Sequence, residues 1–284
     1  MIEKLKYANI SSIYTKELIF YDKAIEGDCI SFCERNGITY LPDSNRKSCW
    51  KLESNTFRNV ELSEVFTIAP TDLIFSQSTL QKFSDAGIDE VLFVVEDERV
   101  VAVVHVVDYN NPFIQFECFK TISQFERSIR KLLKEEGESN HSFLDWCRIQ
   151  GEEHWQRIFS QFVPDKEKKR RRIEKNMADL SEFQMFNLSD LLSFGIAKEI
   201  LPKQWGSVLN DGDKLHSISQ LRNFIAHNKD FTNVEIREGS SPLFSIRGLQ
   251  KFAKHFGDFV QCFEYVEDHV GLHPNNSLIT RIVD

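Results

Sequence analysis

Two apolar runs joined by a short polar turn are the clearest pattern in the first half of the chain. Residues 91–108, VLFVVEDERVVAVVHVVD, predict a buried strand, a turn at Asp97–Arg99 and a second buried strand. The preceding segment, TLQKFSDAGIDE, has apolar residues at helical spacing and a glycine, Gly87, where the helix would stop. The pattern therefore predicts a helix followed by a β-hairpin.

An earlier segment repeats this order. Residues 16–43, KELIFYDKAIEGDCISFCERNGITYLPD, match residues 71–97, TDLIFSQSTLQKFSDAGIDEVLFVVED. Both begin with an acidic residue and Leu-Ile-Phe, continue with a helical stretch, stop at a glycine and end in an apolar strand. A repeat of this length predicts two similar units that pack together.

The second half of the chain has a helical period instead. TISQFERSIRKLL (121–133) places its apolar residues on one face, and KEEGESNHS (134–142) is a polar linker. Later helical stretches include DGDKLHSISQLRNFIAHN (211–228), with Asp211 or Asp213 as its cap, and GLQKFAKHFGDFVQCFEYVEDHV (248–270). Several such stretches in one half predict an antiparallel helical bundle.

The sequence thus predicts the α+β fold class. We expect an α/β repeat pair over 1–118, with repeats of about 1–60 and 61–118, a connecting helix and linker over 119–139, and an all-α bundle over 140–284.

Charge is spread unevenly between these halves. The formal net charge is −8, which argues against a protein that coats nucleic acid non-specifically. Residues 1–139 carry 16 Lys and Arg against 23 Asp and Glu, a net of −7, and residues 140–284 carry 19 against 20. A basic run lies in the less acidic half, and it either binds an RNA backbone or is a solvated helix face: Lys168, Lys169, Arg170, Arg171 and Arg172.

Several features indicate the compartment. No apolar leader begins the chain, and the longest apolar runs are too short to span a bilayer. The six cysteines include no C-x-x-C pair, so we expect buried, reduced thiols, no zinc site and a cytoplasmic location.

The candidate chemistry lies in SQLRNFIAHNKDF, where Arg222 is followed by Asn223 and, four residues later, by His227. Histidine titrates near neutral pH and can take or deliver the protons that RNA cleavage by a 2′-hydroxyl requires. Arginine is always cationic, and its planar fork fits the charge that develops on phosphate oxygens. In a regular helix, residues five apart point about 140° from each other, so either the helix loosens near His227 or two chains supply the groups.

RNFIAH resembles the Arg-x4–6-His signature of the higher eukaryotes and prokaryotes nucleotide-binding (HEPN) superfamily, over roughly residues 140–284. The resemblance implies a metal-independent endoribonuclease that works as a homodimer on RNA, with Arg222, Asn223 and His227 as catalytic residues. It also implies a role in toxin–antitoxin or phage-defence systems, with an antitoxin or defence partner protein. The alternative is a helix whose polar residues are only solvated, with Arg222 paired to Asp230.

The stretch FTIAPTDLIFSQSTLQKFSDAGIDEVLFVVEDERVVAVVHVVDYN resembles a cystathionine β-synthase (CBS) domain, and the earlier repeat resembles a degenerate copy. The resemblance implies a tandem pair that binds an adenosine nucleotide, with Asp108 on the ribose. His105 stands where the family has a hydroxyl residue that contacts phosphate. Asp108 can equally be a turn residue that ends a strand. The second reading of the whole chain is therefore a non-catalytic module that binds a nucleotide or a protein.

Overall fold

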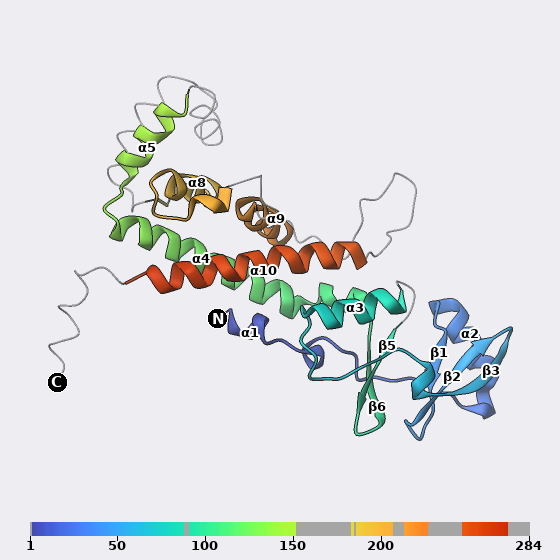
Figure 1. Cartoon of the computed structure of the whole chain (residues 1–284). Coiled ribbons are helices and arrows are strands. Elements are labelled where there is room, and N and C mark those ends of the chain that lie inside the picture. Colours follow the sequence, from blue (N-terminus) through green and yellow to red (C-terminus); the bar gives the residue numbers. More distant parts are fainter. Residues whose placement is uncertain are drawn as a thin grey trace, which may run out of the picture. The chain divides into compact units, whose positions relative to one another are not determined.

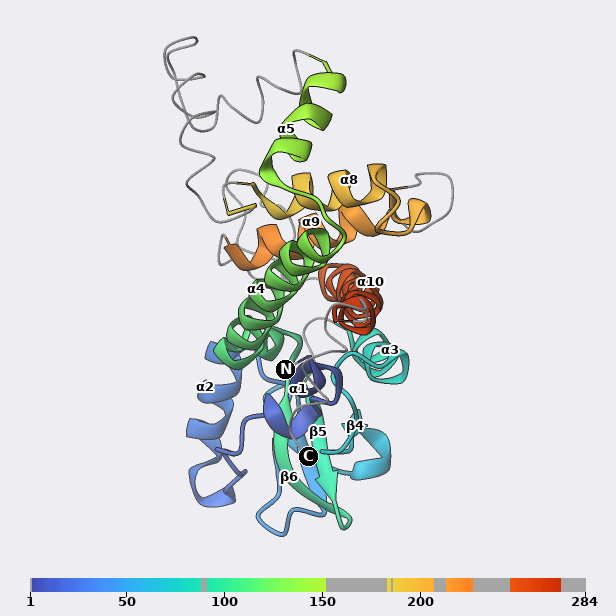
Figure 2. The same ribbon diagram turned by 90° about the vertical axis from the view of Figure 1, so that its left-hand side faces the viewer.

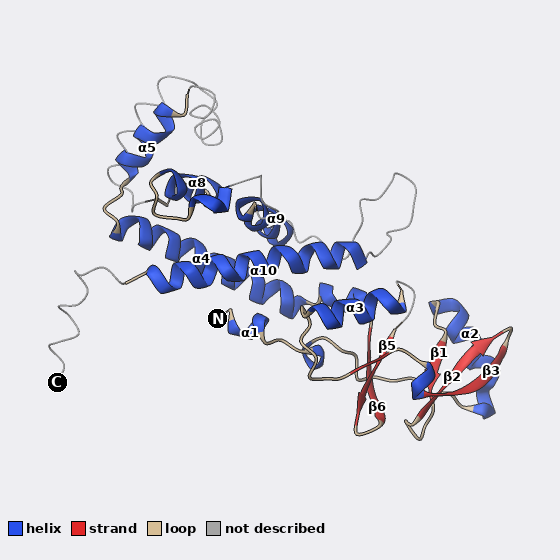
Figure 3. Cartoon of the chain, viewed as in Figure 1, coloured by secondary structure: helices blue, strands red, loops and turns tan. Residues whose placement is uncertain are grey.

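The computed structural model describes residues 2–87, 91–151, 183–184, 186–206, 213–226 and 246–271. The protein is α+β: its strands all lie between Tyr40 and Val104 in the described part of the chain, and long helices follow them (Figures 1 and 3). The predicted class is therefore confirmed at this level. The strands are β1 Tyr40–Pro42, β2 Ser48–Glu53, β3 Thr56–Glu61, β4 Thr67–Ile68, β5 Leu92–Glu96 and β6 Arg99–Val104. The α-helices are α1 Glu3–Lys6, α2 Glu26–Asn36, α3 Gln77–Ala86, α4 Pro112–Glu135, α5 Asn140–Ile149, α8 Leu188–Ala197, α9 Lys214–Ala226 and α10 Ile246–His269.

The chain divides into two compact units. The first comprises Met1–Lys120 and Asn223–Lys254, and the second comprises Thr121–Arg222 and His255–Asp284. These units group residues by their contacts, and the domains proposed from the sequence, 1–118, 119–139 and 140–284, stay a prediction.

The hairpin and helix predicted over the second repeat are confirmed. Helix α3 begins at Ser76, whose side chain accepts from the Thr79 N–H, and it ends at Gly87, whose φ of 91° suits glycine. Strands β5 and β6 pair antiparallel around Asp97 and Glu98, which have φ values of 48° and 59°. Positive φ at both central residues is the signature of the tight turn that matches the twist of a hairpin.

The second strand is shorter than predicted. β6 ends at Val104, and Val106–Asn110 form a 3₁₀ turn in place of further strand. The backbone N–H of His105 donates to Asp108 Oδ2 at 2.7 Å, and Tyr109 donates its hydroxyl to the Ile74 carbonyl at 2.6 Å. Burial of Tyr109 therefore bends the chain away from the sheet at a point where the apolar run alone predicts that the strand continues.

The two repeats have the same order of elements, but their strands pair differently. Each has a helix, a glycine at positive φ, a strand and an antiparallel strand, and the first glycine is Gly37 with a φ of 64°. The first sheet has the order β1-β2-β3 and is antiparallel, whereas the second, β4-β5-β6, has β4 parallel to β5. A common core of Cys49, Val60, Phe93 and Val100 joins the two sheets. The elements of the two segments therefore share a core, and their assignment as repeats of about 1–60 and 61–118 stays a prediction.

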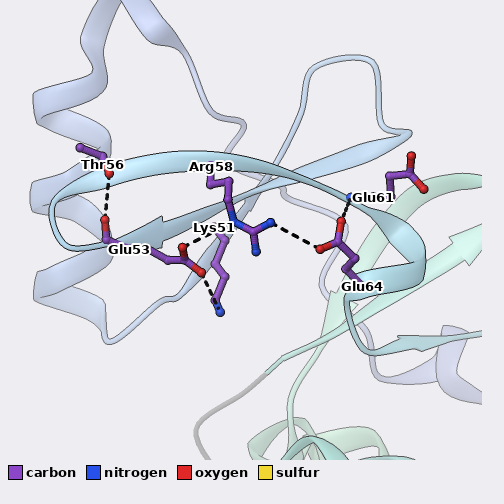
Figure 4. A network of polar contacts seen from close by, with 6 residues as sticks. All are labelled: Lys51, Glu53, Thr56, Arg58, Glu61 and Glu64. Carbon is purple, nitrogen blue, oxygen red and sulfur yellow. Dashed lines mark hydrogen bonds and ion pairs between the residues drawn. The ribbon is translucent and has the colours of Figure 1, made fainter.

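A charged network covers the β2–β3 hairpin (Figure 4). Arg58 lies between two carboxylates, with Nε 3.5 Å from Glu53 and Nη1 3.5 Å from Glu64. Lys51 contacts Glu53 at 3.0 Å, and this hydrogen bond is the main reason that the pKa of the Glu53 carboxyl is lowered. Because β3 is an edge of its sheet, these exposed charges disfavour pairing with a strand of another chain more than they add stability.

In the second unit, α4 and α10 pack along each other (Figures 1 and 2). Phe125 meets Phe259 edge to face with ring centroids 5.2 Å apart, and Ser128 donates to Glu267 at 2.6 Å. The helices predicted over 121–133 and 248–270 are confirmed. α4 starts earlier than the apolar pattern indicates, because Asn111 accepts from the Phe113 N–H at 2.8 Å and Pro112 suits a first helical position.

An aromatic cluster joins α5 and α8 in the same unit. Phe143 stacks on Phe186 with ring centroids 3.8 Å apart and meets Phe194 at 5.0 Å. The buried Phe183 has a φ of 63°, which is unfavourable for an aromatic residue. Its N–H donates to Asn140 Oδ1 at 2.6 Å, and its carbonyl accepts from Arg130 Nε at 3.0 Å. These contacts from α5 and α4 hold the turn in place.

Candidate functional site

Helix α9 carries two of the three residues proposed for catalysis. Its inner face is buried at Ser217, Ile218 and Leu221, so the next two residues, Arg222 and Asn223, point outward and are exposed. The described helix reaches Ala226, and His227 lies outside the described residues. The structure therefore places Arg222 and Asn223 on an accessible helix face and leaves the position of the imidazole as a prediction.

An aspartate side chain caps the first turn of α9. Asp213 accepts from the His216 N–H at 2.9 Å, as the sequence predicts for one of the two aspartates there. Within the described part of the chain, the Arg222 guanidinium makes no hydrogen bond or ion pair. An exposed guanidinium of this kind can bind an anion without first breaking an internal contact. Asp230, the alternative partner considered for Arg222, is outside the described residues, as are Lys168–Arg172.

A buried polar cluster between α9 and α10 has no counterpart in the sequence analysis. Ser217 donates its hydroxyl proton to Asp258 Oδ2 at 2.6 Å, and His255 Nδ1 lies 3.0 Å from the Ser217 hydroxyl oxygen. Because the only hydroxyl proton goes to the carboxylate, His255 must donate from Nδ1, which fixes its tautomer. The ring of the exposed His216 meets that of His255 edge to face at 6.0 Å.

The cluster is a positioning device for α9 and not a nucleophilic triad. In a catalytic triad the histidine lies between the serine and the carboxylate, whereas here Ser217 lies between His255 and the carboxylate of Asp258. Ser217 is also only 4% exposed, so a substrate has little access to its hydroxyl. A second hydrogen bond, from Lys214 Nζ to Gln261 Oε1 at 2.7 Å, lies beside it along the same two helices. Together these bonds fix the helix that carries Arg222. Sequence reasoning missed them because nothing local shows that Ser217 faces α10.

The predicted nucleotide contact, Asp108, takes part in a capping turn of the first unit. Asp108 accepts from the His105 N–H, and His105 Nδ1 accepts from the Val107 N–H at 3.3 Å. Burial raises the pKa of the Asp108 carboxyl above its ordinary value, and the hydrogen bond from the His105 backbone opposes that rise. This geometry gives Asp108 a structural task, and ribose binding by Asp108 with His105 stays a prediction.

We expect Asp108→Asn and Asp108→Ala to differ in stability. The amide oxygen of asparagine can still accept from the His105 N–H and carries no charge to desolvate, so D108N should unfold at or above the wild-type denaturant midpoint at pH 7. Alanine leaves that donor unsatisfied and should lower the free energy of unfolding by about 1 kcal/mol.

Urea unfolding at several pH values checks this expectation. Because the pKa of the Asp108 carboxyl is raised, the folded protein binds the Asp108 proton more tightly than the unfolded chain does. The wild-type protein therefore loses stability as pH rises from the ordinary aspartate pKa through the raised pKa of Asp108. The advantage of D108N should shrink as pH falls toward that ordinary value. If the two variants are equally destabilised at every pH, the capping role is wrong.

Burial suppresses the ionisation of several cysteine thiols. All six cysteines are buried and free, as predicted, and burial raises the pKa of Cys33 to about 11 and that of Cys49 to about 12. Thiols that stay protonated at neutral pH are poor nucleophiles. Among the residues with described positions, no three His, Cys, Asp or Glu side chains gather closely enough to bind a metal ion.

No helix in the described ranges is long and apolar enough to cross a membrane.

Comparison with protein-family models, with curated proteins and with solved structures finds no significant match to this chain.

Proposed function

We propose that the protein is a metal-independent endoribonuclease of the HEPN type, with Arg222, Asn223 and His227 as its catalytic residues. The observation that carries the proposal is the placement of Arg222 on the outer face of α9, exposed and without an internal partner in the described chain, five residues before His227. A buried or ion-paired arginine would have favoured a structural role for the motif.

The reaction assigns a task to each residue. The 2′-oxygen of a ribose attacks the adjacent phosphorus, and the bond from phosphorus to the 5′-oxygen breaks. One imidazole removes the 2′-hydroxyl proton and a second delivers a proton to the leaving 5′-oxygen, so the products are a 2′,3′-cyclic phosphate and a 5′-hydroxyl. Arg222 stabilises the charge on the non-bridging oxygens, and Asn223 orients the phosphate.

A homodimer supplies the two imidazoles. One His227 from each chain, facing the other across a two-fold axis, provides a base and an acid without a metal ion. The division of labour also removes the difficulty that Arg222 and His227 point about 140° apart in one regular helix. In this proposal residues 1–118 are a CBS-like module that builds the dimer or binds an adenosine nucleotide, and an antitoxin or defence partner controls the enzyme.

The test is cleavage of a labelled single-stranded RNA by the purified full chain in EDTA. We expect products that carry 2′,3′-cyclic phosphates, and we expect no cleavage of the same oligonucleotide with 2′-O-methyl groups, because the attacking hydroxyl is blocked. Cleavage of the methylated strand, or activity only with a divalent ion, would exclude this mechanism. Absence of any cleavage would favour the alternative, a non-catalytic module that binds a nucleotide or a protein.

A further inference from the structure

Helix α10 has an exposed basic stripe in the first unit. Arg247, Lys251 and Lys254 are all exposed, and their spacing of four and three residues places them on one face of the helix. The rise per residue separates them by about 6 Å and about 4.5 Å along the axis. Three cations in a row on one helix face form a surface that attracts a chain of negative charges.

No internal partner offsets these charges in the described structure. Among the described residues, Arg247, Lys251 and Lys254 make no ion pair, although some other exposed lysines do, such as Lys203 with Glu199 at 2.6 Å. Residues 246–257 include no Asp or Glu, and the next acid, Asp258, accepts the Ser217 hydroxyl. The stripe is thus a local positive surface on a chain with a net charge of −8.

The order of charges along α10 is not explained by helix stability. The helix has no acidic residue in its first turn, where its dipole favours one, and its last turn holds Glu267 and Asp268, which the dipole disfavours, beside His269. Each unfavourable placement costs a few tenths of a kcal/mol or more. The helix dipole therefore does not account for the position of Arg247 in the first turn.

The stripe lies beside the end of α9. In the first unit Phe252 packs against Phe224 with ring centroids 6.4 Å apart and against Phe75 at 5.6 Å. Phe224 directly follows Asn223, and Phe252 directly follows Lys251. This aromatic pair therefore joins the residue after Lys251 to the residue after Asn223 within the first unit.

We infer that Arg247, Lys251 and Lys254 bind the phosphate backbone of a single-stranded RNA. The inference rests on the proposed function, and it adds the surface that holds the strand while the groups at the end of α9 act on it. Long side chains spaced by about one helical turn can each reach a different phosphate, and neutralising phosphates releases counterions, so the affinity falls with salt. The three residues contribute affinity and not sequence preference, because phosphates are the same in every nucleotide.

The test measures binding of the full chain to a fluorescent 2′-O-methyl RNA by anisotropy, so that cleavage does not interfere. The variant R247Q/K251Q/K254Q should bind roughly 100-fold more weakly at about 0.1 M salt, and the slope of log affinity against log salt should fall by about 2, since each single-strand phosphate contact contributes about 0.7. The control R127Q/K131Q/K203Q removes three exposed cations from α4 and the segment after α8, and it should bind like the wild type. The variant R247K/K251R/K254R retains all three charges and should keep the affinity.

The outcomes separate this inference from the proposed function. Wild-type affinity in the triple glutamine variant overturns the inference, as does equal weakening by the control, and RNA cleavage by the same protein can still stand. Absence of RNA binding by the unmodified chain, with or without binding to vesicles of anionic lipid, also overturns it. If the triple glutamine variant alone loses RNA binding and the unmodified chain never cleaves RNA, the stripe is supported as an RNA-binding surface and the proposed ribonuclease activity is excluded.

Discussion

Replacing His227 by alanine should reduce RNA cleavage by about 10²- to 10⁴-fold, because general acid–base catalysis contributes that much when its proton carrier is removed. Arg222→Ala should cause a loss of similar size by removing the cation that stabilises the phosphate oxygens. Single-turnover cleavage of a labelled RNA measures both. His141→Ala is the matched control, since the His141 side chain is 83% exposed and its imidazole lies 3.5 Å from the Asp145 carboxylate on the surface of α5.

A mixture of wild-type and His227→Ala chains tests whether each centre uses two chains. If one centre needs the His227 imidazoles of both chains, mixed dimers are inactive, and an equal mixture should retain about a quarter of the activity of the same amount of wild-type protein after subunit exchange. Retention of about half of the activity would place a complete centre in each chain. Full cleavage by the His227→Ala protein would contradict the proposed mechanism altogether.

Arg130→Met should destabilise the second unit strongly, because the Arg130 side chain joins α4 to the turn that contains Phe183. Arg130 donates to the carbonyls of Phe183 and Phe186, at 3.0 Å and 3.1 Å, and also contacts the Glu126 carboxylate. Both phenylalanines are buried, so their carbonyl groups lose a donor that water cannot easily replace. We expect the free energy of unfolding to fall by about 2–4 kcal/mol.

Arg127→Met provides the comparison for this loss. Arg127 is exposed one turn earlier on the same helix, and its replacement should change stability by no more than about 0.5 kcal/mol. Urea unfolding followed by tryptophan fluorescence measures the difference, because Trp146 lies in the aromatic cluster beside Phe143 and Phe194. Similar midpoints for the two variants would show that the arginine does not hold the Phe183 turn.

The sequence predicts the local elements of this protein well, because local interactions determine them. The helix that stops at Gly87 and the β5–β6 hairpin with its turn at Asp97–Glu98 follow from backbone preferences and from the alternation of apolar residues. The same reasoning predicts the helices that contain Phe125 and Phe259, whose apolar stripes face each other in the second unit. It also identifies Arg222 and Asn223 as a candidate pair on one helix.

Only the tertiary structure decides which polar side chains meet. The contact of Ser217 with Asp258 and His255 joins residues about 40 positions apart, and no spacing along the chain indicates it. Burial of Tyr109 likewise ends β6 at Val104 and commits Asp108 to a capping turn, although the apolar pattern continues past that point. Exposure of Arg222 is a property of how α9 packs on α10, because the same residue on the opposite face would be buried. Local preference selects helix or strand, whereas long-range packing selects the partners and the accessibility of each side chain.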